Sequence, residues 1–84
     1  MRLRSYRQVE DAEWVSQYDA AKELGLSMFR LSFVLANDHL DSVENSKNEQ
    51  GVTRKSLVVE KQWRQNASLF KKFIRILSDI INWI

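Results

Sequence analysis

The chain has 84 residues, no cysteine and a formal net charge of +2. This length suits one small domain, whose thin core is often supported by a partner. The missing thiols exclude disulfides and cysteine-based metal sites. The N-terminus lacks the apolar run of a signal peptide, and no segment has the length of an uncharged membrane span. The composition therefore predicts a cytoplasmic single-domain protein.

Charge is distributed unevenly along the chain. Residues 14–52 hold three cations against six acidic residues, whereas residues 53–84 hold seven cations against two. The positive field is thus expected in the last third of the chain. His39, the only histidine, stands near no carboxylate pair at metal-ligand spacing, and no side chains are paired as in an active site. We expect no metal, no cofactor and no catalysis.

The first helix is expected to follow a flexible arm. Residues 1–13 mix charges with few apolar side chains, which predicts the arm. Ser16 followed by Asp19 resembles a capping box, because each side chain can meet a free backbone N–H there. The helix should run from about 17 to 24, and Gly25 supplies the left-handed backbone that ends it.

A second helix is expected from about 28 to 36. Ser27 is its natural N-cap. Leu31, Val34 and Leu35 fall at positions i, i+3 and i+4, which predicts that they form the buried face.

The remaining elements are a ribbon and further helices. Short apolar pieces flank the polar loop 44–51, which predicts a two-stranded ribbon. Thr53 caps a third helix that begins at Arg54. Residues 69–84 carry a broad apolar stripe with polar residues opposite, the pattern of an amphipathic helix.

The apolar stripe predicts a segment, residues 67–84, that packs on the core and joins two copies, because polar flanks suit helix pairing. A helix lying on a membrane surface is the rival, since Lys71, Lys72 and Arg75 would suit an interface. We expect no membrane contact, because a small domain needs this apolar surface for itself. The predicted dimer interface consists of Leu69, Phe70, Phe73, Leu77, Ile80, Ile81 and Ile84.

The spacing of residues 16–40 is that of a helix-turn-helix. Ala21 stands four residues before Gly25, so that two helices can approach closely. The string "EWVSQYDAAKELGLS" resembles the winged helix-turn-helix domains of the MerR and excisionase type. Those domains open with an aromatic and an aliphatic residue, a capping Ser or Thr, "AA" and "LGVS" or "LGLS". The resemblance covers about residues 13–65.

This resemblance implies a mostly α fold. A winged helix-turn-helix domain over residues 14–66 would carry a short two-stranded β wing and be followed by the apolar C-terminal helix. It also implies DNA binding, usually as a dimer, in transcription control or site-specific recombination. Asp38 stands where the family has a glycine, so Asp38 must take the left-handed conformation or the turn must differ.

In the geometry that the resemblance implies, the second helix enters the major groove. Arg30 there suits a guanine edge or a phosphate; a solvated arginine or an ion pair to Glu23 is the alternative. Ser27 serves first as a helix cap. Cations beside the wing would hold the phosphate backbone. The predicted DNA-contacting residues are Ser27, Met28, Arg30, Ser32, Phe33, Lys47, Arg54 and Lys55.

Phe29 and Phe33 are neighbours on one helix face. They could contact thymine methyls, pack beneath the C-terminal helix or the arm, or bind a protein; packing is favoured because exposed aromatic pairs are usually covered. The sequence predicts a homodimeric, nucleoid-associated protein that binds specific double-stranded DNA as a small transcriptional regulator or excisionase-type factor. The alternative is a protein-interaction module on the same scaffold without DNA binding.

Overall fold

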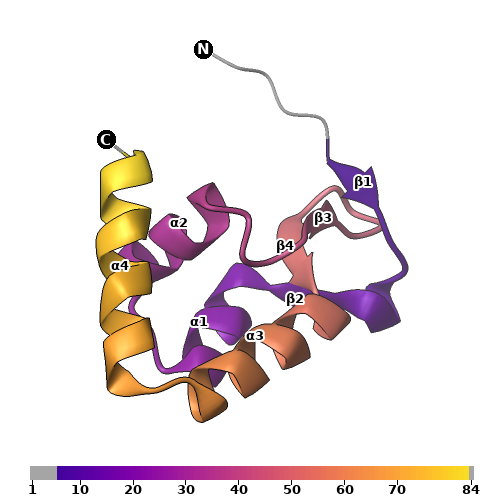
Figure 1. The fold of residues 1–84 in the computed structure, drawn as a ribbon. Helices are drawn as coiled ribbons and strands as arrows, with labels where there is room; N and C mark the ends of the chain where they lie inside the picture. The colour runs from indigo at the N-terminus through magenta and orange to yellow at the C-terminus, as the bar shows by residue number, and fades with distance from the viewer. Residues whose placement is uncertain (1–5, 84) are drawn as a thin grey trace.

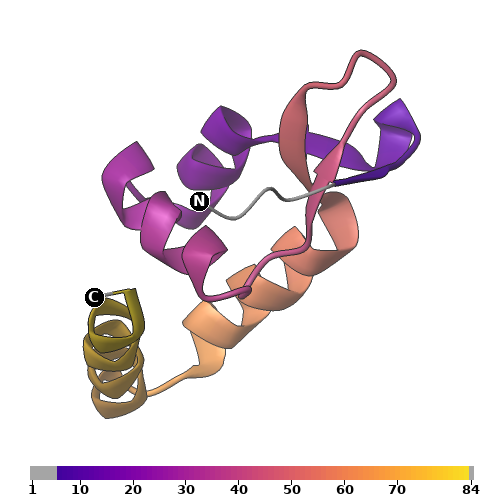
Figure 2. The ribbon, with the colours of Figure 1, turned by 90° about the horizontal axis from the view of Figure 1, so that it is seen from above.

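The computed structural model describes residues 6–83. In Figures 1 and 2 the strands gather at one end of the molecule, helices α1 to α3 form the middle, and α4 stands at the opposite edge. The helices are α1 (Gln17–Leu24), α2 (Met28–Ala36), α3 (Arg54–Asn66) and α4 (Leu69–Trp83). The strands are β1 (Arg7–Gln8), β2 (Trp14–Ser16), β3 (Ser42–Glu44) and β4 (Gln50–Thr53), and a 3-10 turn, η1, spans Asp11–Glu13.

The strands form one mixed sheet in the order β1-β3-β4-β2. Strand β1 runs parallel to β3, with Arg7 opposite Val43, while β4 is antiparallel to both β3 and β2. The predicted mostly α winged helix with a two-stranded wing is therefore wrong: residues 6–83 form four helices and a four-stranded mixed sheet, which is an α/β fold.

The two additional strands come from the segment before α1. Both residues of β1 are exposed, so the strand lacks the apolar alternation by which strands are predicted. Strand β2 is three residues long and ends at the capping residue of α1. Residues 1–5 of the predicted arm lie outside the described part. The rest of it forms β1 and η1, and Asp11 accepts hydrogen bonds from the backbone and hydroxyl of Ser46.

The predicted bounds of α1 and α2, the predicted start of α3 and the three predicted capping residues are confirmed. The hydroxyls of Ser16, Ser27 and Thr53 each accept a bond from the backbone N–H three residues on, at 3.0 to 3.2 Å. Such bonds satisfy N–H groups that have no partner inside the helix. Gly25 adopts φ 68°, and Asp38 adopts φ 57°, the left-handed conformation that was one of the two alternatives at this position.

The core lies between β2, β4, α1, α2 and the start of α3. Ala20 and Ala21 are buried, and these small side chains let α1 approach its neighbours closely. Leu31 and Val34 are buried as predicted, and Leu35 is partly buried against them. The core residues are Val15, Ala20, Ala21, Leu31, Val34, Leu40, Val52 and Leu57.

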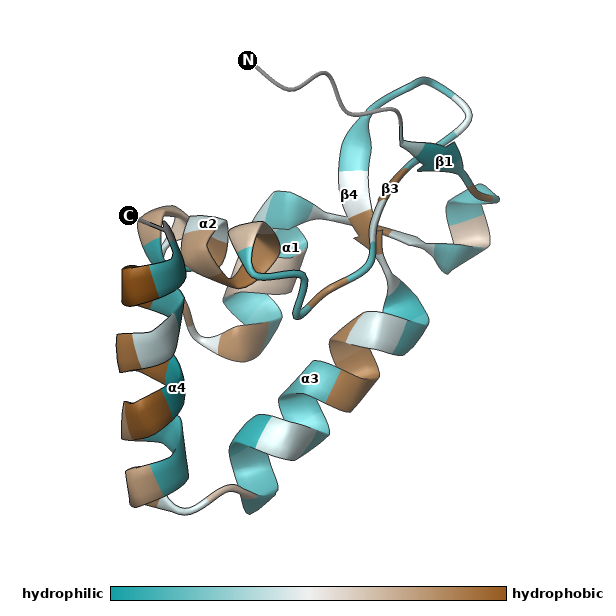
Figure 3. Cartoon of the chain, turned by 45° about the horizontal axis from the view of Figure 1, so that its top comes forward, coloured by the Kyte–Doolittle hydropathy of each residue, from teal (hydrophilic) through white to brown (hydrophobic). Residues whose placement is uncertain are grey.

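Helix α4 contributes none of its described side chains to this core. Among its described side chains only that of the charged Asp79 is buried, at 8% exposed, whereas its large apolar side chains are 38% to 85% exposed. Figure 3 shows the hydrophobic stripe of α4 on the side turned away from the other helices. The expectation that α4 packs its apolar stripe on the core is therefore wrong: its polar face meets the domain, and only the edge of the stripe at Ile76 and Ile80 borders α2.

Candidate functional site

The site is built on the turn between α1 and α2. The left-handed Gly25 reverses the chain, and the N–H of Leu26 donates to the carbonyl of Ala21 at 2.8 Å. Ser27 then caps α2. Because Leu31 and Val34 hold one face of α2 in the core, the opposite face is presented to solvent.

The outward face of α2 is mainly apolar. Met28 and Phe29 are exposed large hydrophobic residues, and Arg30 and Ser32 are exposed beside them. The hydroxyl of Ser32 donates to the carbonyl of Phe29 at 2.5 Å, so its hydrogen is used within the helix. The hydroxyl can still accept a bond from a base or a phosphate-bound water.

The two phenylalanines have different surroundings. Their rings meet edge to face, with centroids 5.0 Å apart, a favourable aromatic geometry. Phe29 is 71% exposed. Phe33 is half-buried and lines a cavity together with Ile76 and Ile80 of α4. Phe29 borders the same cavity, but most of its surface is exposed, so the packing interpretation holds for Phe33 and not for Phe29.

The four predicted contact cations, Arg30, Lys47, Arg54 and Lys55, are exposed and make no ion pair within residues 6–83. Arg7, in contrast, forms an ion pair with Asp41 at 2.7 Å. The alternative partner proposed for Arg30, Glu23, pairs with Lys61 at 3.1 Å. The predicted cations are thus free to bind an external anion.

These cations do not form one patch. Arg30 borders a depression between α2 and α4, Arg54 one between α1 and α3, and Lys55 one beside Asp41. Lys47 lies in the loop between β3 and β4. Any shared ligand must therefore be extended enough to reach several segments.

Sequence reasoning missed two residues beside the N-terminus of α2. Tyr18 and Lys22 of α1 border a depression together with Ser27 and Met28. Lys22 makes no ion pair with any described residue, so it adds positive charge where the helix N-terminus already favours an anion. In the sequence, Lys22 could have been identified by its position three residues before Gly25, in the last turn of α1.

The loop that carries Lys47 is held by hydrogen bonds. The side-chain oxygen of Asn45, which is buried, accepts from the N–H groups of Lys47 and Glu49 at 2.9 Å each. Gln8 of β1 and Trp14 of β2 donate to the carbonyls of Asn45 and Glu49. Strands β1 and β2, which were not predicted from the sequence, therefore stabilise the β3–β4 hairpin that carries the exposed Lys47.

An ionic network that sequence reasoning missed attaches α4 to α3. Glu60, whose side chain is 4% exposed, accepts from Arg64 at 3.0 Å and from Arg75 of α4 at 2.7 Å. The guanidinium of Arg75 lies 3.9 Å from the ring centroid of Trp63. The sequence indicates only one contact of this network, the Glu60–Arg64 pair, because residues four apart are neighbours on a helix face.

His39 extends this network towards α2. Its Nε2 lies 2.8 Å from an oxygen of Asp79 and 3.3 Å from Nε of Arg75. One nitrogen cannot donate and accept at once, so the shorter contact places the proton towards Asp79. The amide of Asn37 also donates to the carbonyl of Asp79 at 3.2 Å. Polar contacts thus hold α4 beside the end of α2.

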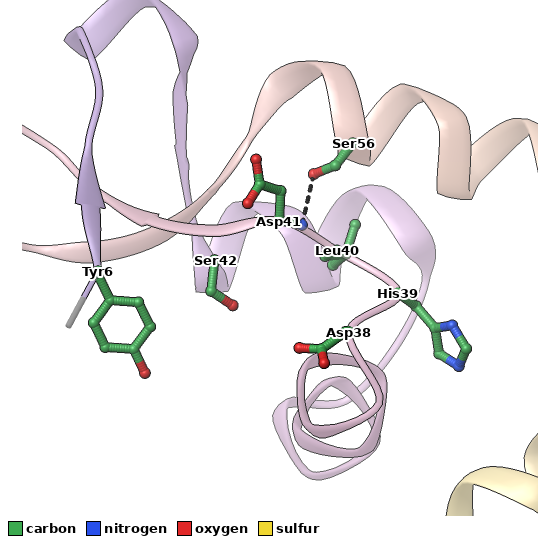
Figure 4. A pocket seen from close by; sticks show the side chains of 7 residues that line it. All are labelled: Tyr6, Asp38, His39, Leu40, Asp41, Ser42 and Ser56. Atoms are coloured by element: carbon green, nitrogen blue, oxygen red, sulfur yellow. Dashed lines mark hydrogen bonds between the residues drawn. The ribbon is translucent and has the colours of Figure 1, made fainter. Parts of the chain in front are cut away.

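A depression of about 460 Å³ lies between β1 and the segment after α2 (Figure 4). Its wall includes Tyr6, Asp38, Ser42 and Ser56. The Ser56 hydroxyl donates to the carbonyl of Thr53 and accepts from the backbone N–H of Asp41, so it is already engaged on both sides (Figure 4). No group of three or more potential metal ligands is assembled in the part of the chain that the structure describes.

No helix within residues 6–83 combines the length and the apolar character needed to cross a bilayer. The chain matches no family model, no curated protein and no solved structure.

Proposed function

We propose that this protein binds specific double-stranded DNA sequences through α2, as a small transcriptional regulator or recombination accessory factor. The observation that carries the proposal is that Arg30, Lys47, Arg54 and Lys55 are exposed and make no ion pair among the described residues, while the outward face of α2 is open to solvent. Duplex DNA is extended, so its phosphates can meet cations from separate segments. Such a protein would be cytoplasmic and associated with the nucleoid.

In this proposal α2 lies in the major groove. Arg30 pairs with a guanine edge or a phosphate, and the exposed Met28 and Phe29 face thymine methyls. The N-terminus of α2, with Lys22 nearby, receives a phosphate. Base contacts confer sequence preference, whereas phosphate contacts set the position of α2 on the duplex.

Removing two predicted contacts should weaken DNA binding. We expect the double variant Arg30→Ala/Arg54→Ala to bind a duplex at least about tenfold more weakly at low salt, since each base or phosphate contact contributes roughly 1 kcal/mol or more. Fluorescence anisotropy with a labelled duplex measures the affinity.

A double variant with the same charge change is the control. Arg7→Ala/Lys61→Ala removes two cations that are already engaged with Asp41 and Glu23. We expect it to bind DNA nearly as the parent does. Equal losses in both double variants would show that net charge alone governs binding and would overturn the assigned contacts.

We also propose that two copies associate through the apolar face of α4. Leu69 is 85% exposed and Ile81 69% exposed, and six further large apolar residues of α4 are exposed. With about 200 Å² for a fully exposed residue of this size, the six of these residues that lie away from α2 leave roughly 750 Å² uncovered, close to the ~800 Å² per partner of a standard interface. Ile74 joins the predicted set, Ile76 and Ile80 border the cavity between α2 and α4 instead, and Ile84 lies outside the described residues.

The dimer should depend on exposed apolar residues of α4. We expect Phe70→Asp and Ile81→Asp each to weaken self-association at least about a hundredfold, because a carboxylate would be buried without a partner. Sedimentation equilibrium measures the association. Ser78→Asp on the exposed polar side of the same helix is the control and should leave the dimer intact. A parent chain that is monomeric, or that binds liposomes through this face, would contradict the proposal.

A protein-interaction module without DNA binding is the second candidate. The exposed apolar pair Met28 and Phe29 favours it, as do Glu44 and Glu49, which repel phosphate from the hairpin. This candidate predicts no binding to random duplex even at low ionic strength.

A further inference from the structure

A second cavity lies between α2 and α4, on the flank of the proposed DNA-binding helix. Its volume is about 190 Å³. Phe29 and Phe33 from α2 and Ile76 and Ile80 from α4 supply most of its apolar wall, and Arg30 lines it as well. The cavity is separate from the large polar depression beside β1.

The size of this cavity limits its occupant. An apolar cavity of about 150 Å³ accommodates benzene, whereas sites for drug-sized ligands begin at about 300 Å³. A volume of about 190 Å³ therefore suits one aromatic ring with a small substituent. The aromatic and branched side chains give such a ring edge-to-face and aliphatic contacts.

The charge of the cavity is positive. Arg64 also lines it but is paired with Glu60, and Asp79 is engaged by His39. Arg30 has no ion-pair partner among the described residues. Arg30, which borders the apolar wall, thus remains without a counter-charge, and a guanidinium binds carboxylate in a bidentate, charge-assisted geometry.

We propose that the α2–α4 cavity binds a single-ring aromatic carboxylate. The ring lies among Phe29, Phe33, Ile76 and Ile80, and the carboxylate pairs with Arg30. The ligand contacts both helices and shares Arg30 with the proposed DNA surface. The proposal itself does not require DNA binding, and its test contains no DNA.

Benzoate is the probe for this site, and its neutral counterpart is benzyl alcohol. We expect benzoate to shift backbone amide resonances of α2 and α4 in ¹H–¹⁵N spectra, with a dissociation constant on the order of 1 mM for a ligand of this size. Benzyl alcohol should bind roughly tenfold more weakly, since it lacks the charge. The variant Arg30→Gln should weaken benzoate binding by about the same factor.

The control variant is Arg7→Gln, which removes an arginine paired with Asp41 outside the cavity. It should bind benzoate as the parent does. Equal binding of benzoate and benzyl alcohol, or equal losses in both arginine variants, would overturn the carboxylate assignment. Absence of shifts in α2 and α4, or shifts that follow protein concentration alone, would overturn the site, the latter because a second copy fills the cavity.

Discussion

Replacing Gly51 with alanine is expected to destabilise the protein by about 3 kcal/mol or more, because the new methyl overlaps backbone. A Cβ at Gly51 would lie 2.3 Å from the carbonyl oxygen of Val15 and 2.4 Å from Nε1 of Trp14. Gly51 stands opposite Ser16 in the β2–β4 pair. The overlap can be relieved only by moving β2 away from β4, which opens the core at Val15. Urea denaturation measures the loss.

Gly25→Ala is the matched control for this substitution. Its Cβ meets nothing within 4 Å, but its φ of 68° strains an alanine. The left-handed conformation costs an L-residue roughly 1–2 kcal/mol. If Gly51→Ala costs no more than Gly25→Ala, the close approach of β2 to β4 is wrong.

Replacing Glu60 with alanine should cost about 3–5 kcal/mol, the usual penalty for breaking a buried ion pair on one side. The change leaves Arg64 and Arg75 without their carboxylate, and Arg75 is the α4 member of the network. Hydrogen exchange should then show faster exchange in α4 than in α1. Urea denaturation measures the free energy of unfolding.

The control is Glu23→Ala, which breaks the exposed pair with Lys61. Exposed pairs contribute about 0–1 kcal/mol. Similar small losses for Glu60→Ala and Glu23→Ala would show that the network does not hold α4 in place.

The helices could be predicted because their signals are local. A capping hydroxyl reaches an N–H three residues away, and Gly25 ends α1 through its own backbone freedom. Strand β1 has no such signal, because its partner β3 lies 36 residues further along the chain and Arg7 and Gln8 are both exposed. The error in fold class follows from that difference.

The orientation of α4 could not be predicted from its periodicity. The apolar stripe shows that α4 has two faces, but the face that meets the domain depends on residues elsewhere. Asp79 contacts His39, and Arg75 pairs with Glu60; both partners are distant in sequence. These polar contacts hold α4 with its apolar stripe outwards.

The sequence predicted which residues form the candidate site but not which of them are engaged in ion pairs. Arg30, Arg54 and Lys55 could be named from helix positions, but their lack of ion pairs depends on tertiary contacts. Glu23, a predicted partner of Arg30, is instead engaged by Lys61 from α3. Spacing within one helix cannot show which charge a neighbouring helix will supply.

The most direct test of DNA binding is a salt titration with a duplex of random sequence. If Arg30, Lys47, Arg54 and Lys55 each neutralise one phosphate, the logarithm of the affinity should fall linearly with the logarithm of salt concentration, with a slope of about −3 to −4. Absence of binding at low salt, or an affinity that does not change with salt, would contradict the proposed function.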